Sequence, residues 1–152
     1  MTKSSLLIIL GNDNVGKSTY IRNNYFYCKS LHFDKPKPDQ PTWHSDYDRI
    51  FDSTDLLVCD RGYPEAHLYQ QIDKNLIIGY HKKVCEVFNV EFELIEHDWD
   101  FELENRHYRE LVSWHPDASE WWLSWQLKKR YNEHIQYYKV IKPLINELRK
   151  TC

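Results

Sequence analysis

Continuous apolar runs alternate with amphipathic segments along this chain, and that alternation predicts its secondary structure. Residues 5–10 and 56–59 are apolar runs, and each ends at a polar turn. Such runs are typical of parallel strands that are buried on both faces. A shorter strand is predicted at 31–33, and the alternation of polar and apolar residues at 90–95 predicts a strand with one solvated face.

The segments between these strands repeat apolar residues every three or four positions, which predicts helices with one buried face. The longest covers about residues 118–148, and Pro143 is expected to bend or break it. Residues 34–41 are rich in proline and are expected to form an irregular loop. The other helices are predicted at 18–27, at 42–52 with Thr42 as cap and Trp43, Tyr47, Ile50 and Phe51 on one face, from Pro64 onward, at 74–88, and from Asp98 or Asp100 to Val112.

Strands that alternate with helices predict an α/β protein with a small parallel sheet of four or five strands. The 152 residues suit one domain, and 41% apolar residues are enough for a hydrophobic core. Without an internal repeat or a flexible linker, residues 1–152 are interpreted as that single domain.

Charge and cysteine content restrict the partners and the compartment. A net charge of −3 argues against a long duplex nucleic acid as partner. No apolar run is long enough to span a membrane, and the N-terminus does not resemble a signal peptide, so a cytoplasmic protein is expected. Neither a zinc motif nor a disulfide framework fits the spacing of the cysteines, which are expected to be free thiols. They are Cys28, Cys59, Cys85 and Cys152.

The most informative motif follows the first predicted strand. Gly11-Asn-Asp-Asn-Val-Gly-Lys17-Ser18 matches G-x-x-x-x-G-K-[ST] in full, between a strand and a helix. Glycines let such a loop point its backbone N–H groups at phosphate oxygens, and the following helix adds the positive end of its dipole. Lys17 is expected on the β- and γ-phosphates, and the Ser18 hydroxyl on Mg²⁺. The predicted residues for ATP are Gly11, Asn14, Val15, Gly16, Lys17, Ser18 and Thr19.

A second motif ends the predicted strand 56–59. Asp60 follows the apolar run directly, at the place where a second Mg²⁺-associated carboxylate belongs. Because the carboxyl ends of parallel strands meet at one crevice, Asp60 is expected to face the first loop. Arg61 comes next, and its forked donors suit a phosphate group.

These residues carry a resemblance to a known family. The segment Asp60-Arg61-Gly-Tyr-Pro-Glu-Ala-His-Leu-Tyr69 resembles the Asp-Arg segment of thymidylate kinases and phage-type deoxynucleoside monophosphate kinases. The first loop agrees, since those kinases have an acid at the position of Asp13. The resemblance implies a P-loop kinase-like three-layer sandwich with a short lid at about residues 99–117.

The resemblance also implies residue roles. Asp13 would lie near the acceptor, and Lys35 would reach it from the loop after the second strand. Transfer between two polyanions requires cations that hold donor and acceptor together, and a lid that excludes water. Lys17, Arg61 and the lid residue Arg106 are therefore the predicted catalytic residues.

The expected function is ATP- and Mg²⁺-dependent phosphoryl transfer to a nucleoside or deoxynucleoside monophosphate. Three alternatives stay open. The same machinery could act on a polynucleotide 5′ end or on a modified base within DNA, so a short DNA end stays open as a partner. A GTPase switch is disfavoured because the chain has no N-K-x-D element. A P-loop module without catalysis is disfavoured by the intact Lys17, Ser18 and Asp60.

Other aromatic and imidazole residues have simpler interpretations. The tryptophans at 114–125 are expected to pack in the core or to form a homodimer face, with base stacking as the alternative. The histidines form no i,i+4 ligand pair with an acid, so no metal other than Mg²⁺ is expected.

Overall fold

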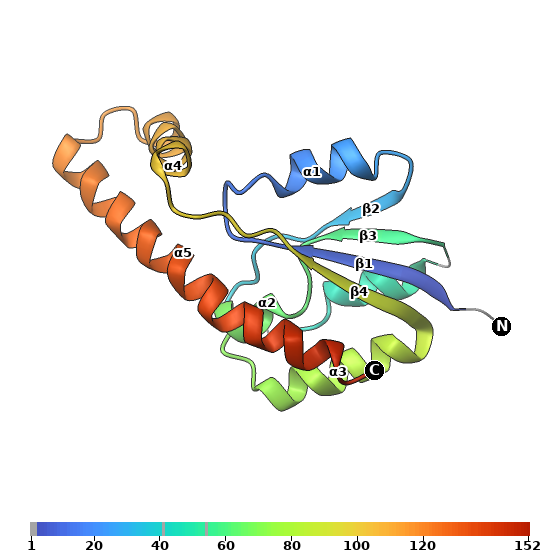
Figure 1. Cartoon of the computed structure of the whole chain (residues 1–152). Helices are drawn as coiled ribbons and strands as arrows, with labels where there is room; N and C mark the ends of the chain where they lie inside the picture. The colour runs from blue at the N-terminus through green and yellow to red at the C-terminus, as the bar shows by residue number, and fades with distance from the viewer. Residues whose placement is uncertain (1–2, 41, 54) are drawn as a thin grey trace.

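The computed structural model describes residues 3–40, 42–53 and 55–152, and within them a small parallel sheet organises the chain. Its strand order is β2-β3-β1-β4, and every neighbouring pair is parallel (Figure 1). The strands are β1 (Ser4–Leu10), β2 (Lys29–His32), β3 (Leu57–Asp60) and β4 (Phe88–Leu94). The protein is therefore α/β, as the alternation of strands and helices predicts.

The central strand β1 contributes side chains to two hydrophobic cores, one on each face of the sheet. Leu6, Ile8 and Leu10 pack into the larger core, whereas Ile9 points to the opposite face and packs there with Val58. This alternation follows from the two-residue period of a strand. The continuous apolar run thus reflects a strand that is covered on both faces.

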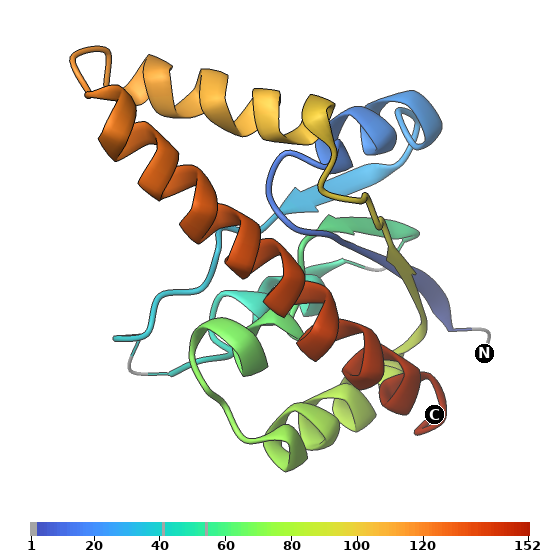
Figure 2. The same ribbon diagram turned by 60° about the vertical axis from the view of Figure 1, so that its left-hand side comes forward.

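Helices cover both faces of the sheet. The helices are α1 (Lys17–Asn24), the 3₁₀ helix η1 (Tyr47–Asp52), α2 (Glu65–Tyr69), α3 (Lys74–Val87), α4 (Phe101–Trp114) and α5 (Glu120–Arg149). In Figure 1, α1 lies on one face of the sheet, and α2, α3 and the end of α5 lie on the other. Figure 2 shows α4 and the beginning of α5 as a helical hairpin that projects beyond the sheet.

Side-chain caps mark three helix starts. Asp73, Asp100 and Ser119 accept a hydrogen bond from a backbone N–H in the first turn of α3, α4 and α5. Each cap satisfies a donor that the helix itself cannot pair. Asp100, one of the two residues expected to begin the helix after β4, is the actual cap.

One predicted helix differs from the structure, and a second is not broken where a bend or a break is expected. Residues 43–46 form turns that lead into η1, so the segment 42–52 is not an α-helix. Its apolar face is nevertheless used, because Tyr47 and Ile50 are buried in the larger core. Helix α5 runs unbroken through Pro143. Residues 34–40 contain neither helix nor strand, as expected, and Pro41 lies outside the described residues.

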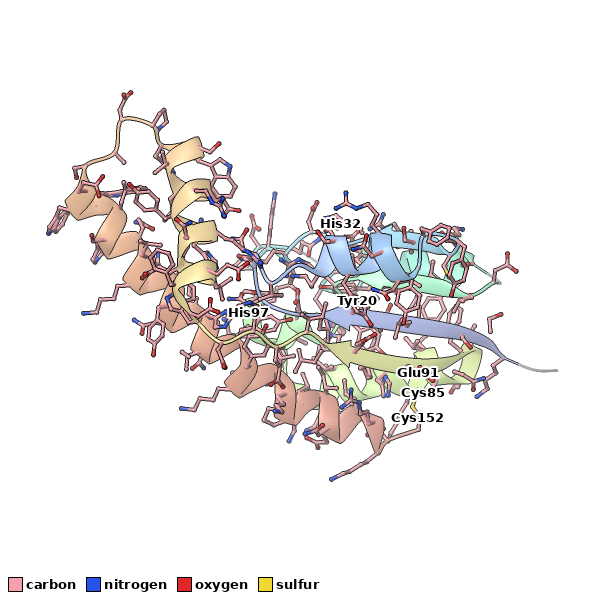
Figure 3. All side chains as sticks on the ribbon, turned by 45° about the horizontal axis from the view of Figure 1, so that its top comes forward. Tyr20, His32, Cys85, Glu91, His97 and Cys152 are labelled. Carbon is pink, nitrogen blue, oxygen red and sulfur yellow. A yellow bond between two sulfur atoms is a disulfide. The ribbon has the colours of Figure 1, made fainter. Side chains whose placement is uncertain are left out.

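The expectation of four free thiols is wrong. Cys85 and Cys152 form a disulfide that joins the C-terminal ends of α3 and α5 (Figure 3). Their Cα atoms are 6.3 Å apart although 67 positions separate them in the sequence. The pairing depends on two helices ending side by side on the same face of the sheet, which cysteine spacing does not reveal. Cys28 and Cys59 are free, and burial raises the pKa of Cys59 to about 12.

Across the described residues, no helix combines the length and the apolar character needed to cross a membrane.

A pair of glycine substitutions tests the packing beneath β1. A Cβ atom at Gly62 would lie 2.6 Å from Cγ2 of the buried Ile8. We expect Gly62→Ala to lower the free energy of unfolding by about 1–3 kcal/mol, because the core must shift to accept the methyl group. Urea-induced unfolding measures the change.

Gly79→Ala is the matched control. Gly79 lies on the exposed face of α3 with no atom within 4 Å of the added Cβ. Alanine should stabilise this helix by up to about 1 kcal/mol. A Gly62→Ala protein that is as stable as the parent would contradict the described packing.

Candidate active site

The loop between β1 and α1 is folded tightly. A Cβ atom at Gly11 would lie 2.9 Å from Cγ2 of Val15 and 3.0 Å from the carbonyl oxygen of Ile95, so the site has no room for a side chain. Asn14 and Gly16 have positive φ angles of 65° and 95°. Gly11 is therefore required by the close packing around it, and Gly16 suits its left-handed backbone conformation.

Lys17 folds back over this loop. Its Nζ atom donates to the carbonyl oxygens of Gly11, at 2.6 Å, and Asn12, at 3.0 Å. Burial, together with the charge of Arg61, lowers the pKa of Lys17 to about 8. The buried ammonium thus has two neutral hydrogen-bond partners inside the loop, and the side chain lines the neighbouring cleft.

Ser18 and Asp60 meet as the two motifs predict. The Ser18 hydroxyl donates to Oδ2 of Asp60 at 3.1 Å, and Nδ1 of His32 lies 3.0 Å from the same oxygen. The other oxygen, Oδ1, is buried and has no hydrogen-bond partner among the described residues. A hydroxyl beside a carboxylate with one unpaired oxygen fits Mg²⁺, which prefers oxygen ligands.

Arg61 is held between two carboxylates. It donates to Oε1 of Glu65 and to Oδ1 of Asp13, each at 2.8 Å. Burial lowers the pKa of Arg61, but Glu65 and Asp13 outweigh that effect and raise it. Its φ angle of 74° is unusual for a bulky residue, and such strain persists where several contacts fix the conformation.

Asp13 connects Arg61 to Lys35. The Nζ atom of Lys35 lies 2.6 Å from Oδ2 of Asp13 and 5.2 Å from the centre of the Tyr69 ring. Burial raises the pKa of Asp13, but Lys35 and then Arg61 lower it to about 2, so this carboxylate is charged at neutral pH. The three residues predicted on the acceptor side therefore lie together.

Two tyrosines of α5 hold the loop through hydrogen bonds to its backbone, and neither contact is predicted from the sequence. Tyr137 is fully buried, accepts the N–H of Gly11 at 3.0 Å and donates to Oε2 of Glu65. Tyr138 accepts the N–H of Asn12 at 3.2 Å and donates to the carbonyl oxygen of Ile95. A tyrosine on an apolar helix face is the expected pattern for core packing, so the sequence carries no signal for these contacts.

Helix α4 contacts the loop at Asn14. Arg106 donates to the carbonyl oxygen of Asn14 at 3.0 Å and to Glu102 at 2.7 Å. Nδ1 of His107 lies 3.3 Å from Nδ2 of Asn14 and 3.1 Å from Nη1 of Arg130. Both neighbours are donors, so Nδ1 is the acceptor and His107 is neutral. Burial, followed by the charge of Arg130, lowers the pKa of His107 to about 4.

One cleft of about 1000 Å³ collects these groups. Every predicted site residue except the buried Gly11 lines it, and Arg106 lines it from α4. His32, Tyr20 and His97, labelled in Figure 3, also line the cleft, as do Trp114 and Arg130. None of these five residues is among the site residues predicted from the sequence, because only the fold brings them to the loop.

A scan against protein-family models gives no match for this chain, and a search of curated proteins finds no similar sequence. We therefore infer the function from the motifs of the chain and the geometry of the cleft.

We expect Tyr137→Phe to lower the free energy of unfolding by about 1–3 kcal/mol, because the substitution removes the hydroxyl that donates to Oε2 of the buried Glu65 and accepts the N–H of Gly11. Thermal and urea unfolding measure the loss. Tyr131→Phe on the same helix is the control, since Tyr131 is 43% exposed. It should change the stability by less than about 0.5 kcal/mol. Equal effects of the two substitutions would contradict the role given to Tyr137.

The pKa of His107 predicts a pH dependence of stability. In the unfolded chain the imidazole has its ordinary pKa of 6.5, whereas in the folded protein the pKa is about 4. Between these values the unfolded state binds more protons, so the free energy of unfolding falls as the pH decreases from about 6.5 to about 4. His107→Asn should make this decrease shallower. His115→Asn, at an exposed position, should not; a parent-like slope in His107→Asn would contradict the assignment.

Proposed function

We propose that this protein transfers the γ-phosphoryl group of ATP, with Mg²⁺, to a nucleoside monophosphate. The observation that carries the proposal is the meeting of two sets of residues in one cleft. Lys17, Ser18 and Asp60 provide a site for the donor. Arg61 and Lys35 provide cations directly beside it. The proposed activity is expected in the cytoplasm.

The donor side supports binding of a triphosphate. Residues 13–19 of the loop and the first turn of α1 line the cleft, and two of the loop residues have the left-handed backbone that is typical of anion-binding loops at a helix N-terminus. Among the described residues Lys17 donates to two carbonyl oxygens and to no carboxylate, so it would exchange neutral partners for phosphate oxygens when the donor enters. Ser18 and Asp60 would hold Mg²⁺, which supplies neutralisation of charge on the β- and γ-phosphates.

The acceptor side supports a second phosphate. Glu65 and Asp13 fix the direction of the Arg61 guanidinium, so its forked donors need little reorganisation to bind an anion. Arg106 reaches the loop from the predicted lid, where it is placed to add charge and to exclude water.

A neighbouring pocket fits the nucleoside part of the acceptor. About 700 Å³ in volume, it shares Lys35 with the cleft. Leu68 and Tyr69 provide an apolar wall, and Asn132 and Gln136 of α5 provide amide groups. Such a combination of an aromatic face with amide donors and acceptors suits a nucleobase.

One observation favours a second candidate, a kinase for the 5′ end of a single strand. Trp121 and Trp125 are exposed, and their positions fall on the same helical face of α5 as Asn132 and Gln136. The two tryptophans are about 6 Å apart along the helix axis. Exposed aromatic rings at such a spacing suit successive bases of an extended strand.

The experiment is ATP turnover with Mg²⁺ against nucleoside monophosphates in ribo and deoxy form, nucleosides, and 5′-hydroxyl oligonucleotides. We expect transfer to one or a few deoxynucleoside monophosphates. Lys17→Ala should lower kcat at least about 100-fold, because it removes a cation from the transferring phosphoryl group. Arg61→Ala should lower kcat/KM for the acceptor and leave ATP binding intact.

Lys83→Ala, at an exposed position on α3, is the control and should keep the parent activity. Transfer only to an oligonucleotide would overturn the monophosphate as acceptor and support the second candidate. ATP binding without transfer to any acceptor would contradict both kinase proposals and favour a P-loop module without catalysis.

A further inference from the structure

A second cluster of chemically active side chains lies at the opposite end of α5 from the helical hairpin. The possible ligand atoms of His81, Cys85 and Cys152 all lie within 4.8 Å of one another. His81 and Cys85 are one turn apart on α3, and Sγ of Cys85 is 3.5 Å from Nε2 of His81. Figure 3 shows Cys85 and Cys152 joined beside the end of α5. Nothing in the proposed phosphoryl transfer uses these residues.

The His81 ring is fixed in position. Its Nε2 atom lies 3.0 Å from the carbonyl oxygen of Leu148, which can only accept, so Nε2 carries the proton. The hydroxyl of Tyr63 therefore donates to Nδ1. The hydrogen bonds at both ring nitrogens hold the imidazole next to the two sulfur atoms. A histidine that binds a metal through one ring nitrogen usually donates the N–H of the other, and the Tyr63 oxygen is placed to accept it from Nδ1 once Nε2 has given up its proton.

We propose that reduction of the disulfide between Cys85 and Cys152 creates a site for one thiophilic divalent cation, with His81 as third ligand and Zn²⁺ as the expected ion. Tetrahedral Zn²⁺ with ordinary bond lengths separates a sulfur ligand from a nitrogen ligand by roughly 3.6 Å. Cys85 and His81 already have that separation. Cys152 is exposed, so its side chain can move to the sulfur-to-sulfur distance of roughly 3.8 Å that the same geometry requires.

The chemistry balances in two steps. A dithiol reductant gives two electrons and two protons to the disulfide, which yields two cysteine thiols and the oxidised reductant. Metal binding then replaces the two thiol protons, while the imidazole proton moves from Nε2 to Nδ1 and can be donated to the Tyr63 oxygen. The net release is two protons for each ion bound.

The site would have a structural consequence. The disulfide connects the last turn of α3 with the residues that follow α5, and α5 carries the tyrosines that support the phosphate loop. A metal held by the same residues would keep that connection where the disulfide is reduced. The inference is independent of the proposed phosphoryl transfer.

The experiment compares the oxidised protein with protein that has been reduced and freed of reductant. Each is titrated with Co²⁺ as a spectroscopic probe and then with Zn²⁺. We expect the reduced protein to bind one equivalent of Co²⁺ with thiolate-to-metal charge-transfer absorption, to lose that absorption when Zn²⁺ is added, and to release two protons. The oxidised protein should show none of this absorption. Sulfur-specific absorption also separates the site from the oxygen ligands of Ser18 and Asp60.

Two cysteine variants provide the comparison. Cys152→Ser, at an exposed position, should lower the affinity of the reduced protein for Zn²⁺ at least tenfold. Cys28→Ser removes a free thiol outside the cluster and should leave both affinity and absorption unchanged. The proposal is overturned if the reduced parent shows no thiolate absorption with Co²⁺, or if Cys152→Ser binds as tightly as the parent.

Discussion

The fully buried carboxylate of Glu65 is the constraint on which the rest of the site depends. An ionised group without exposed surface is tolerated only where charged and hydrogen-bonding partners surround it. Arg61 provides the charge, and Tyr137 provides a hydroxyl from a helix more than seventy positions later in the chain. The same hydroxyl accepts the N–H of Gly11. A single buried charge therefore connects the end of β3, helix α5 and the loop between β1 and α1.

That constraint explains how α5 fixes the conformation of the loop between β1 and α1. Two adjacent tyrosines accept the first two backbone N–H groups of the loop. These groups would otherwise be buried donors in need of a partner. Because both hydroxyls also donate onward, to Glu65 and to the carbonyl oxygen of Ile95, neither ring can rotate without breaking two bonds. The loop is thus held in shape before any ligand is bound, which lowers the cost of binding.

The sequence predicts features that depend on local patterns and misses contacts that depend on how distant helices pack. The four strands, the helix start at Asp100, and the position of Asp60 facing the first loop depend on local patterns or on the fixed geometry of neighbouring parallel strands. The disulfide and the contacts of Tyr137 and His107 depend on where α4 and α5 pack. No hydrophobic period encodes that packing. The 3₁₀ helix η1 is predicted in part: the sequence indicates its buried face but not its tighter winding.

The cations of the cleft differ in how readily they can change partners, and this difference separates their roles. Lys17 is bonded to neutral carbonyl oxygens and loses no ion pair when it turns to a phosphate. Lys35 pairs with Asp13 where both side chains are partly exposed, and water screens such a pair. Arg61 is different, because leaving Glu65 would strand a buried charge. The guanidinium is therefore expected to stay in place and to bind an anion without moving, as a fixed clamp requires, while the lysines adjust around it.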